Sequence, residues 1–268
     1  MMTLQECITC NMILMSIADT NYIDATIPPS PEQVEDGLTD ADMYVREAWA
    51  LRKDFTPTPE HIERGLSDAE WIVREAWARR MDFTPTPEQI ERGITDRNAQ
   101  VRLTWVLRVD ILFTLQQVRK GVQDEEWTIR AAMAKRTDFT PTPDIIERGL
   151  LDENPTIRLI WSKRNDFTPT LEHIDIGLTD SYWEVRKAWA QRTDYTPQPR
   201  HIQKGISDAS TAVVIAWLMR CDIEWTQEQM QLGLQHPDEH IRSAWEATLH
   251  RQNERHTKIS KYANIESI

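Results

Sequence analysis

The sequence predicts an all-α protein, an α-solenoid superhelix of eight helix-turn-helix repeats of 28 residues each. Residues 54–81 read DFTPTPEHIERGLSDAEWIVREAWARRM, and residues 82–109 repeat them closely as DFTPTPEQIERGITDRNAQVRLTWVLRV. Further copies follow every 28 residues without an insertion. All eight glycines of the chain fall at position 12 of a repeat, counted from its first residue. These regular spacings predict stacked helical hairpins that share one core.

The repeats are expected to occupy residues 26–53, 54–81, 82–109, 110–137, 138–165, 166–193, 194–221 and 222–249. Residues 1–25 and 250–268 break the pattern. We interpret them as an N-terminal cap and as a C-terminal cap or tail, because the ends of a repeat stack are usually capped.

Each repeat begins with residues that are typical of a helix start. In repeat 2, Thr58-Pro59-Glu60 supplies an N-cap, a first-turn proline and an acid at the positive helix end. Ile62 and Leu66 have the spacing of a buried stripe on this first helix, helix A. The glycine at position 12, Gly65 in this repeat, costs about 1 kcal/mol against alanine inside a helix. Its recurrence predicts either the close approach of a neighbouring backbone or the end of helix A.

A second helix, helix B, is expected to follow a cap at position 15, which is Asp68 in repeat 2. Val73 and Trp77 belong to its buried stripe. Arg80 at position 27 falls in the last turn, where a cation favours the negative end of the helix dipole. The aromatic residue of the next Asp-Phe-Thr-Pro link is predicted to fill the joint between repeats. The other tryptophans at position 24 are expected in the core: Trp49, Trp105, Trp161, Trp189, Trp217 and Trp245.

A recurring motif joins the two helices: Leu-x-Asp followed by Val-Arg-x-Ala, as in Leu66-Ser67-Asp68 with Val73-Arg74-Glu75-Ala76. The motif resembles HEAT-type α-solenoid repeats, and the short period of 28 is similar to HEAT-like and leucine-rich-variant-like short repeats. The resemblance implies ladders of aspartate and arginine between successive repeats. The implied acids are Asp40, Asp68, Asp96, Asp124, Asp152, Asp180 and Asp208. The implied arginines are Arg46, Arg74, Arg102, Arg130, Arg158, Arg186 and Arg242. Repeat 7 departs from the pattern with Val214.

The composition predicts a soluble cytoplasmic protein. Hydrophobic residues make up 40% of the chain and charged residues 28%, which is typical of a packed domain. No apolar stretch approaches the roughly 20 residues of a membrane span, and the short apolar run at residues 12–17 lacks the basic flank of a secretory signal. Three cysteines form no disulfide framework, so a reducing compartment is expected. The net charge of −12 argues against a partner held by phosphate neutralisation.

The positions that vary between repeats are the candidates for function. Position 18 of helix B lies opposite the buried stripe and is Trp71, Trp127 or Trp183 in repeats 2, 4 and 6. Repeats 3, 5 and 7 instead carry an aliphatic residue at position 22, on the same face: Leu103, Leu159 and Ile215. Two interpretations stay open. The tryptophans lie flat and seal the helix B layer, or they form an apolar ribbon that binds a partner on the concave side.

No sequence motif indicates catalysis, a cofactor or a metal site. Cys7 and Cys10 form a single CxxC, whereas structural zinc needs four ligands. His236 and His240 are one helical turn apart but lie seven repeats away from these cysteines. The glycines are isolated, so no phosphate-binding loop is expected, and no hydrolase motif is present.

These patterns support three hypotheses, in order of preference. The first is a non-enzymatic scaffold or adaptor that binds a protein along the concave helix B face. The second is an acidic decoy or inhibitor that occupies a basic, nucleic-acid-binding site of a partner such as a nuclease or a defence complex. The third is an enzyme resembling HEAT-like DNA glycosylases. We expect a monomer with a protein partner, basic in the decoy case, and without direct contact to nucleic acid or membrane.

Overall fold

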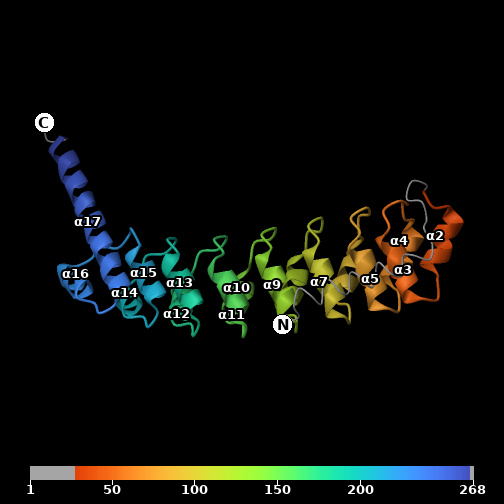
Figure 1. Cartoon of the computed structure of the whole chain (residues 1–268), viewed down its shortest axis with the longest axis horizontal. Helices are drawn as coiled ribbons and strands as arrows, with labels where there is room; N and C mark the ends of the chain where they lie inside the picture. Colours follow the sequence, from red (N-terminus) through yellow and green to blue (C-terminus); the bar gives the residue numbers. More distant parts are fainter. Residues whose placement is uncertain (1–27, 266–268) are drawn as a thin grey trace. The chain divides into compact units, whose positions relative to one another are not determined.

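The computed structural model describes residues 28–265, with side chains as far as Thr257. This part of the chain contains 16 helices, α2–α17, and no strand (Figure 1). The helices alternate between helix A and helix B with the period of 28 residues, which confirms the predicted fold class. Helices A are α2 (Pro31–Leu38), α4 (Pro59–Leu66), α6 (Pro87–Ile94), α8 (Leu115–Val122), α10 (Pro143–Leu150), α12 (Leu171–Leu178), α14 (Pro199–Ile206) and α16 (Gln227–Leu234). Helices B are α3 (Met43–Leu51), α5 (Trp71–Ala78), α7 (Ala99–Leu107), α9 (Trp127–Lys135), α11 (Pro155–Ser162), α13 (Trp183–Gln191), α15 (Thr211–Leu218) and α17 (Glu239–Ile265).

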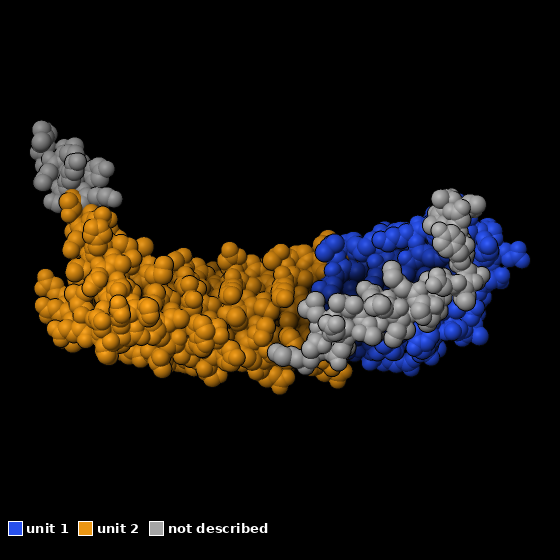
Figure 2. All heavy atoms as spheres, viewed as in Figure 1, with its two compact units in different colours: residues 1–110 blue, residues 111–268 orange. Residues whose placement is uncertain are grey.

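The helices belong to two compact units (Figure 2). Unit 1 extends to Asp110 and holds α2–α7, and unit 2 begins at Ile111 and holds α8–α17. Within each unit every hairpin packs against the next, and neighbouring helices B contact each other more closely than neighbouring helices A do. None of the described helices is both long and apolar enough to cross a lipid bilayer.

Helix A starts at a reciprocal cap. In α4 the hydroxyl of Thr58 accepts the N–H of His61 at 3.2 Å, and Nδ1 of His61 accepts the N–H of Thr58 at 3.3 Å. In α6 the Thr86 hydroxyl and the Gln89 side chain make the same pair of bonds. Seven repeats therefore hold Gln or His at position 8, because each supplies an acceptor that closes this capping box, whereas repeat 5 has Ile145 and no such cap.

Helix B starts two residues later than the sequence predicted. The carboxylate of Asp68 accepts the N–H of Glu70 at 2.9 Å and forms the turn between α4 and α5. The N-cap of α5 is Glu70 at position 17. The expectation that Asp68 itself caps helix B is wrong, because its carboxylate is used to shape the turn before the helix.

A tryptophan lies directly on the recurring glycine. A Cβ atom built on Gly149 would lie 2.2 Å from Nε1 of Trp161, well inside contact distance. The same close approach occurs between positions 12 and 24 of every repeat, with Met133 in place of tryptophan above Gly121. No glycine has a positive φ angle. The glycine is therefore required by the side chain of its own repeat, and the predicted approach of a neighbouring backbone is wrong.

The tryptophans at position 24 form the core, as expected. Trp77, Trp105, Trp161, Trp189 and Trp217 are fully buried, Trp245 is buried, and Trp49 in the first repeat is half-buried. Each of these rings fills the space between helix A and helix B, and the five fully buried ones are the largest fully buried side chains of the described chain.

The last repeat ends differently from the others. Thr248 stands where seven repeats have arginine, and helix α17 continues without a break to Ile265. Trp225, at position 4 of this repeat, is buried with its ring 5.0 Å from that of Trp245. Its backbone N–H and C=O both bond the side chain of Gln252 from the extended part of α17.

We predict that Gly149→Ala destabilises the protein by about 1–3 kcal/mol, because the new methyl group overpacks the rigid indole of Trp161. Gly121→Ala is the matched control, since its methyl group meets the flexible end of Met133. Both changes gain the same helix propensity. Urea unfolding followed by circular dichroism compares them, and equal midpoints for the two variants would show that the indole contact does not require glycine.

Candidate protein-interaction face

A first row of arginines, at position 21, connects helix B of one repeat to the turn between the two helices of the next repeat. Arg130 of α9 donates Nε and Nη2 to the two carboxylate oxygens of Asp152 at 2.7 and 3.0 Å. Its Nη1 donates to the carbonyls of Asp124 and Glu125 in its own repeat. Both partners of the Arg130–Asp152 pair are buried. The pair fixes the spacing of two neighbouring helices B because it joins them at their N-terminal ends.

The pairs found within one unit are Arg46–Asp68, Arg74–Asp96, Arg130–Asp152, Arg158–Asp180 and Arg186–Asp208. Each arginine pairs with the aspartate of the following repeat, 22 residues later in the sequence. It also donates to the backbone carbonyl of the aspartate of its own repeat, six residues earlier. Asp40 and Asp124 accept the N–H groups of Asp42 and Glu126. Arg102 and Arg242 donate to the carbonyls of Asp96 and His236.

The joint between repeats 7 and 8 replaces both partners of the pair together. Val214 stands in the arginine position and is buried, and His236 stands in the acid position of the next repeat. Nδ1 of His236 accepts the N–H of Asp238, so the histidine keeps the turn-forming role of the aspartate. Asp238 accepts the hydroxyl of Thr211 at 2.9 Å and supplies another link across this joint.

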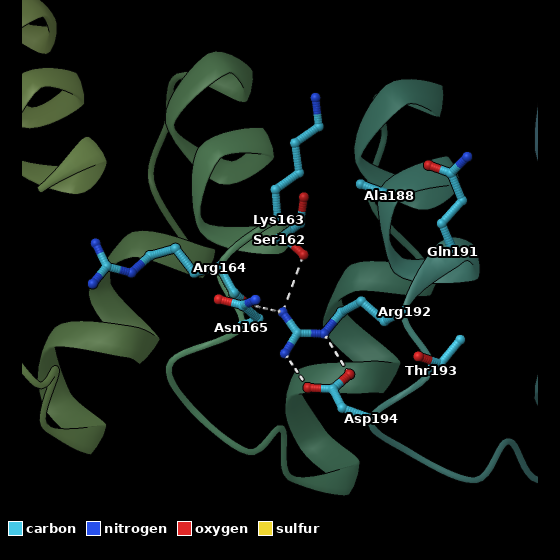
Figure 3. Close-up of a pocket in the computed structure, with 9 residues that line it drawn as sticks. All are labelled: Ser162, Lys163, Arg164, Asn165, Ala188, Gln191, Arg192, Thr193 and Asp194. Atoms are coloured by element: carbon cyan, nitrogen blue, oxygen red, sulfur yellow. Dashed lines mark hydrogen bonds and ion pairs between the residues drawn. The ribbon is translucent and has the colours of Figure 1, made fainter. Parts of the chain in front are cut away.

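A second row of arginines, at position 27, was expected only to favour the helix dipole. Arg192 is buried and donates Nε to Asp194 at 3.0 Å and Nη1 to the carbonyl of Ser162 at 3.1 Å in the preceding repeat (Figure 3). Its guanidinium lies over the rings of Phe167 and Trp189, 4.8 and 5.1 Å from their centroids. The signal for this role is the strict Arg-x-Asp spacing at the end of seven repeats.

The two rows of arginines leave one face of each helix B open. Position 22 lies opposite the buried stripe at 100° per residue, and positions 18 and 26 lie one turn before and after it. We call these three positions the helix B open face. Trp71, Trp127 and Trp183 are 41%, 47% and 41% exposed. Each ring is therefore covered over more than half of its surface and open to solvent over the rest.

The aliphatic residues of the helix B open face are half-buried: Leu103, Leu159 and Ile215. In unit 1, Trp71 on α5 and Leu103 on α7 belong to neighbouring helices B. In unit 2, Trp127, Leu159, Trp183 and Ile215 belong to the consecutive helices α9, α11, α13 and α15. Each unit thus has its own apolar surface that combines exposed rings with half-buried aliphatic side chains.

In unit 1, acidic groups lie between the apolar residues of the open face. Glu75 is buried and accepts bonds from Arg79 at 2.5 Å and from the Thr104 hydroxyl at 3.2 Å. Burial raises the pKa of the neighbouring Glu47 carboxyl, and the charge of Glu75 raises it further. This part of the face holds negative charge in partly dry surroundings.

In unit 2, lysines lie on the open face. Lys135, Lys163 and Lys187 are on α9, α11 and α13, and Nζ of Lys187 lies 6.0 Å from the ring centroid of Trp183. Glu184 also lies on α13 and is half-buried. The two units therefore present similar apolar side chains with different charges.

The residues considered for metal binding are not brought together in the described chain. Cys7 and Cys10 lie outside the described residues, and Cys221 is exposed. Among the described residues, no three His, Cys, Asp or Glu side chains are grouped as metal ligands. His240 lies exposed at the start of α17, and its N–H donates to Asp238.

We predict that Arg130→Val destabilises the protein by about 3–5 kcal/mol, because Asp152 is left as a buried, unpaired charge. The double variant Arg130→Val with Asp152→His copies the residues of the last joint and is expected to recover at least about 1 kcal/mol. Urea unfolding of the single variants and the double variant measures the coupling. Additive losses would show that the pair does not act as a unit.

The carboxylates of this row make stability depend on pH. Burial raises the pKa of Asp96, but hydrogen bonds from Arg74 and from the N–H of Asn98 outweigh it, so the pKa lies below its ordinary value of 3.8. Asp68 and Asp208 behave alike. A lowered folded-state pKa stabilises the fold above pH 3.8, and this contribution is lost as the pH falls from there through the folded-state pKa.

We therefore expect the gap in unfolding midpoint between the native chain and Arg74→Gln to narrow as the pH is lowered from 6 to 3. In the variant, Asp96 keeps its burial without its main partner, so its protonation favours folding rather than opposing it. Urea unfolding at several pH values measures the gap. A constant gap would contradict this assignment, since the other carboxylates contribute equally to both proteins.

No family model and no curated protein matches the sequence. Among solved structures, the chain is similar to one described as a leucine-rich repeat variant with a novel repetitive protein structural motif. The likeness has a TM-score of 0.59 at 22% sequence identity and covers 81% of each chain. It confirms the expected resemblance in fold: the chain has the architecture of a short-repeat helical solenoid.

Proposed function

We propose that the chain is a non-enzymatic scaffold or adaptor that binds a protein partner through the helix B open face. The observation that carries the proposal is the exposure of Trp71, Trp127 and Trp183. Exposed tryptophans are frequent anchors of protein interfaces, because a large ring gains much apolar contact for little lost freedom.

The repeats themselves serve as internal controls for this argument. Position 18 is Ala99 in repeat 3, Pro155 in repeat 5 and Thr211 in repeat 7, and each helix B forms there as well. The fold therefore does not require tryptophan at this position. An exposed ring that the fold does not need is best explained by a contact with another molecule.

A second candidate, the acidic decoy, is favoured by the net charge of −12 and by the acids Glu47 and Glu75 on the open face of unit 1. A decoy would bind a basic site mainly by charge, so salt would weaken it strongly. The lysines of unit 2 favour the scaffold over the decoy, because they would repel a basic surface.

The scaffold proposal takes the chain as a cytoplasmic monomer that contacts neither nucleic acid nor membrane. Cys221 is exposed and unpaired, which suits a reducing compartment.

We predict that replacing Trp71, Trp127 and Trp183 together by alanine weakens partner binding by about 30-fold or more, as expected for the loss of hot-spot residues. The partner is captured from nuclease-treated lysate of the native host at low and high salt, identified, and titrated against both proteins. Circular dichroism checks that the variant keeps its helices.

The matched control replaces three exposed leucines outside the open face: Leu112→Ala, Leu151→Ala and Leu171→Ala. The scaffold is supported by a partner that stays bound at high salt, binds this control normally and fails to bind the tryptophan variant. A partner that binds the tryptophan variant fully but dissociates in salt would reject the open face and favour the decoy.

A further inference from the structure

A second apolar surface lies in unit 1, at the C-terminal ends of its helices B. Leu51, Met81, Leu107 and Val109 occupy positions 26 and 28 and are 45%, 54%, 59% and 85% exposed. They follow the last turns of α3, α5 and α7, at the end of helix B opposite to Trp71. We call these four residues the helix B end surface.

The corresponding positions of unit 2 show that the fold does not require these apolar residues. Repeats 4, 5 and 6 carry Lys135 and Thr137, Lys163 and Asn165, and Gln191 and Thr193 there. The helices end in the same way in both units, since Arg80 and Arg192 make equivalent bonds to the preceding repeat. Among repeats 1–6, exposed apolar residues at these positions therefore occur only in repeats 1–3, and repeat 7 carries Met219, which is 62% exposed.

Two adjacent cavities open on the end surface. The first, of about 510 Å³, is lined by Leu51, Lys53 and Met81 among others. The second, of about 280 Å³, is lined by Met81, Leu107 and Val109 among others. Met81 belongs to both, so the cavities form one continuous row across α3, α5 and α7.

The equivalent cavity in unit 2, of about 300 Å³, is lined by residues of polar type apart from Ala188 (Figure 3). Its exposed residues include Lys163, Asn165, Gln191 and Thr193. The side chains of Lys163 and Gln191 point away from the guanidinium of Arg192 that forms the floor. The hollow therefore occurs in both units, and in repeats 1–3 Leu51, Met81, Leu107 and Val109 take part in lining it.

The charges beside the end surface are mostly positive. Lys53 and Arg79 line the first cavity and are exposed, and Arg79 is paired with Glu75. The one acid that lines it, Asp82, is held by the buried Arg80 at 2.5 Å. Glu47 lies one turn before Leu51 and limits the positive region on the side of the open face. The lining thus favours a partner that brings apolar side chains together with a carboxylate near Lys53.

We propose that the helix B end surface binds a peptide segment of a partner protein that is apolar and carries Asp or Glu but no basic residue. The apolar side chains fill the two cavities, and the carboxylate pairs with Lys53 at the rim. The helix B end surface shares position 26 with the helix B open face but contains none of the tryptophans, so a partner engages it independently of them.

Selection of a random 12-residue peptide library, displayed on phage, against the full chain tests the proposal. The comparison variant carries Met81→Thr, Leu107→Gln and Val109→Asn, which are residue types found at these positions in repeats 4–6. We expect enriched peptides to combine apolar residues with Asp or Glu, and to bind the comparison variant at least about tenfold more weakly. Lys53→Glu is expected to weaken the same peptides.

Each alternative has its own outcome. Enrichment of basic peptides, or equal binding to the comparison variant, would overturn the proposal. The variant without Trp71, Trp127 and Trp183 must bind the peptides normally, which separates this site from the scaffold proposal. Val109→Asn alone is the control for folding, because this side chain is 85% exposed.

Residues 1–25 are apolar and contain three acids and no basic residue. If Glu6→Gln, Asp19→Asn and Asp24→Asn together strengthen peptide binding, the occupant is the chain itself and the proposed external partner is rejected.

Discussion

The contact between the glycine at position 12 and the ring at position 24 is the constraint on which the other features depend. The indole fills the space between helix A and helix B, and it fits only because the glycine has no Cβ. The contact has a cost, because the Nε1 atoms of Trp161, Trp189 and Trp217 are buried without a hydrogen-bond partner in the described chain. The gain in packed apolar area outweighs that cost in every repeat that keeps the tryptophan. Once the ring faces helix A, position 22 of helix B must point away from helix A.

Two rows of arginines convert single hairpins into a stack. The row at position 21 joins the N-terminal ends of neighbouring helices B, as Arg130 and Asp152 show, and the row at position 27 joins their C-terminal ends. The guanidinium of Arg192 also lies over the ring of Trp189, so the second row contacts the same indole that fills the space between helix A and helix B. Buried guanidinium groups are tolerated because carboxylates and backbone carbonyls satisfy nearly all of their donors. Core packing and ion pairs therefore act on the same few positions.

A scaffold that is regular in this way leaves a small set of positions free to vary, and function is expected there. The helix B open face carries exposed tryptophans in alternate repeats, and the helix B end surface carries exposed apolar residues in repeats 1–3. In both cases other repeats of the same chain show that a different residue is compatible with the fold. The charges differ as well, with Glu47 and Glu75 in unit 1 and Lys135, Lys163 and Lys187 in unit 2.

The sequence by itself determined the repeat, its two helices, the start of helix A and the buried tryptophans, because these depend on local caps and on helical periodicity. It also singled out Trp71, Trp127 and Trp183 as variable positions, but their exposure depends on how far apart the neighbouring helices lie. The tertiary structure decided this, together with the reason for the glycine, the start of helix B at Glu70 and the buried role of Arg192. These features arise between helices or between repeats, and a single helical period carries no information about which side chain of the next element will fill a space.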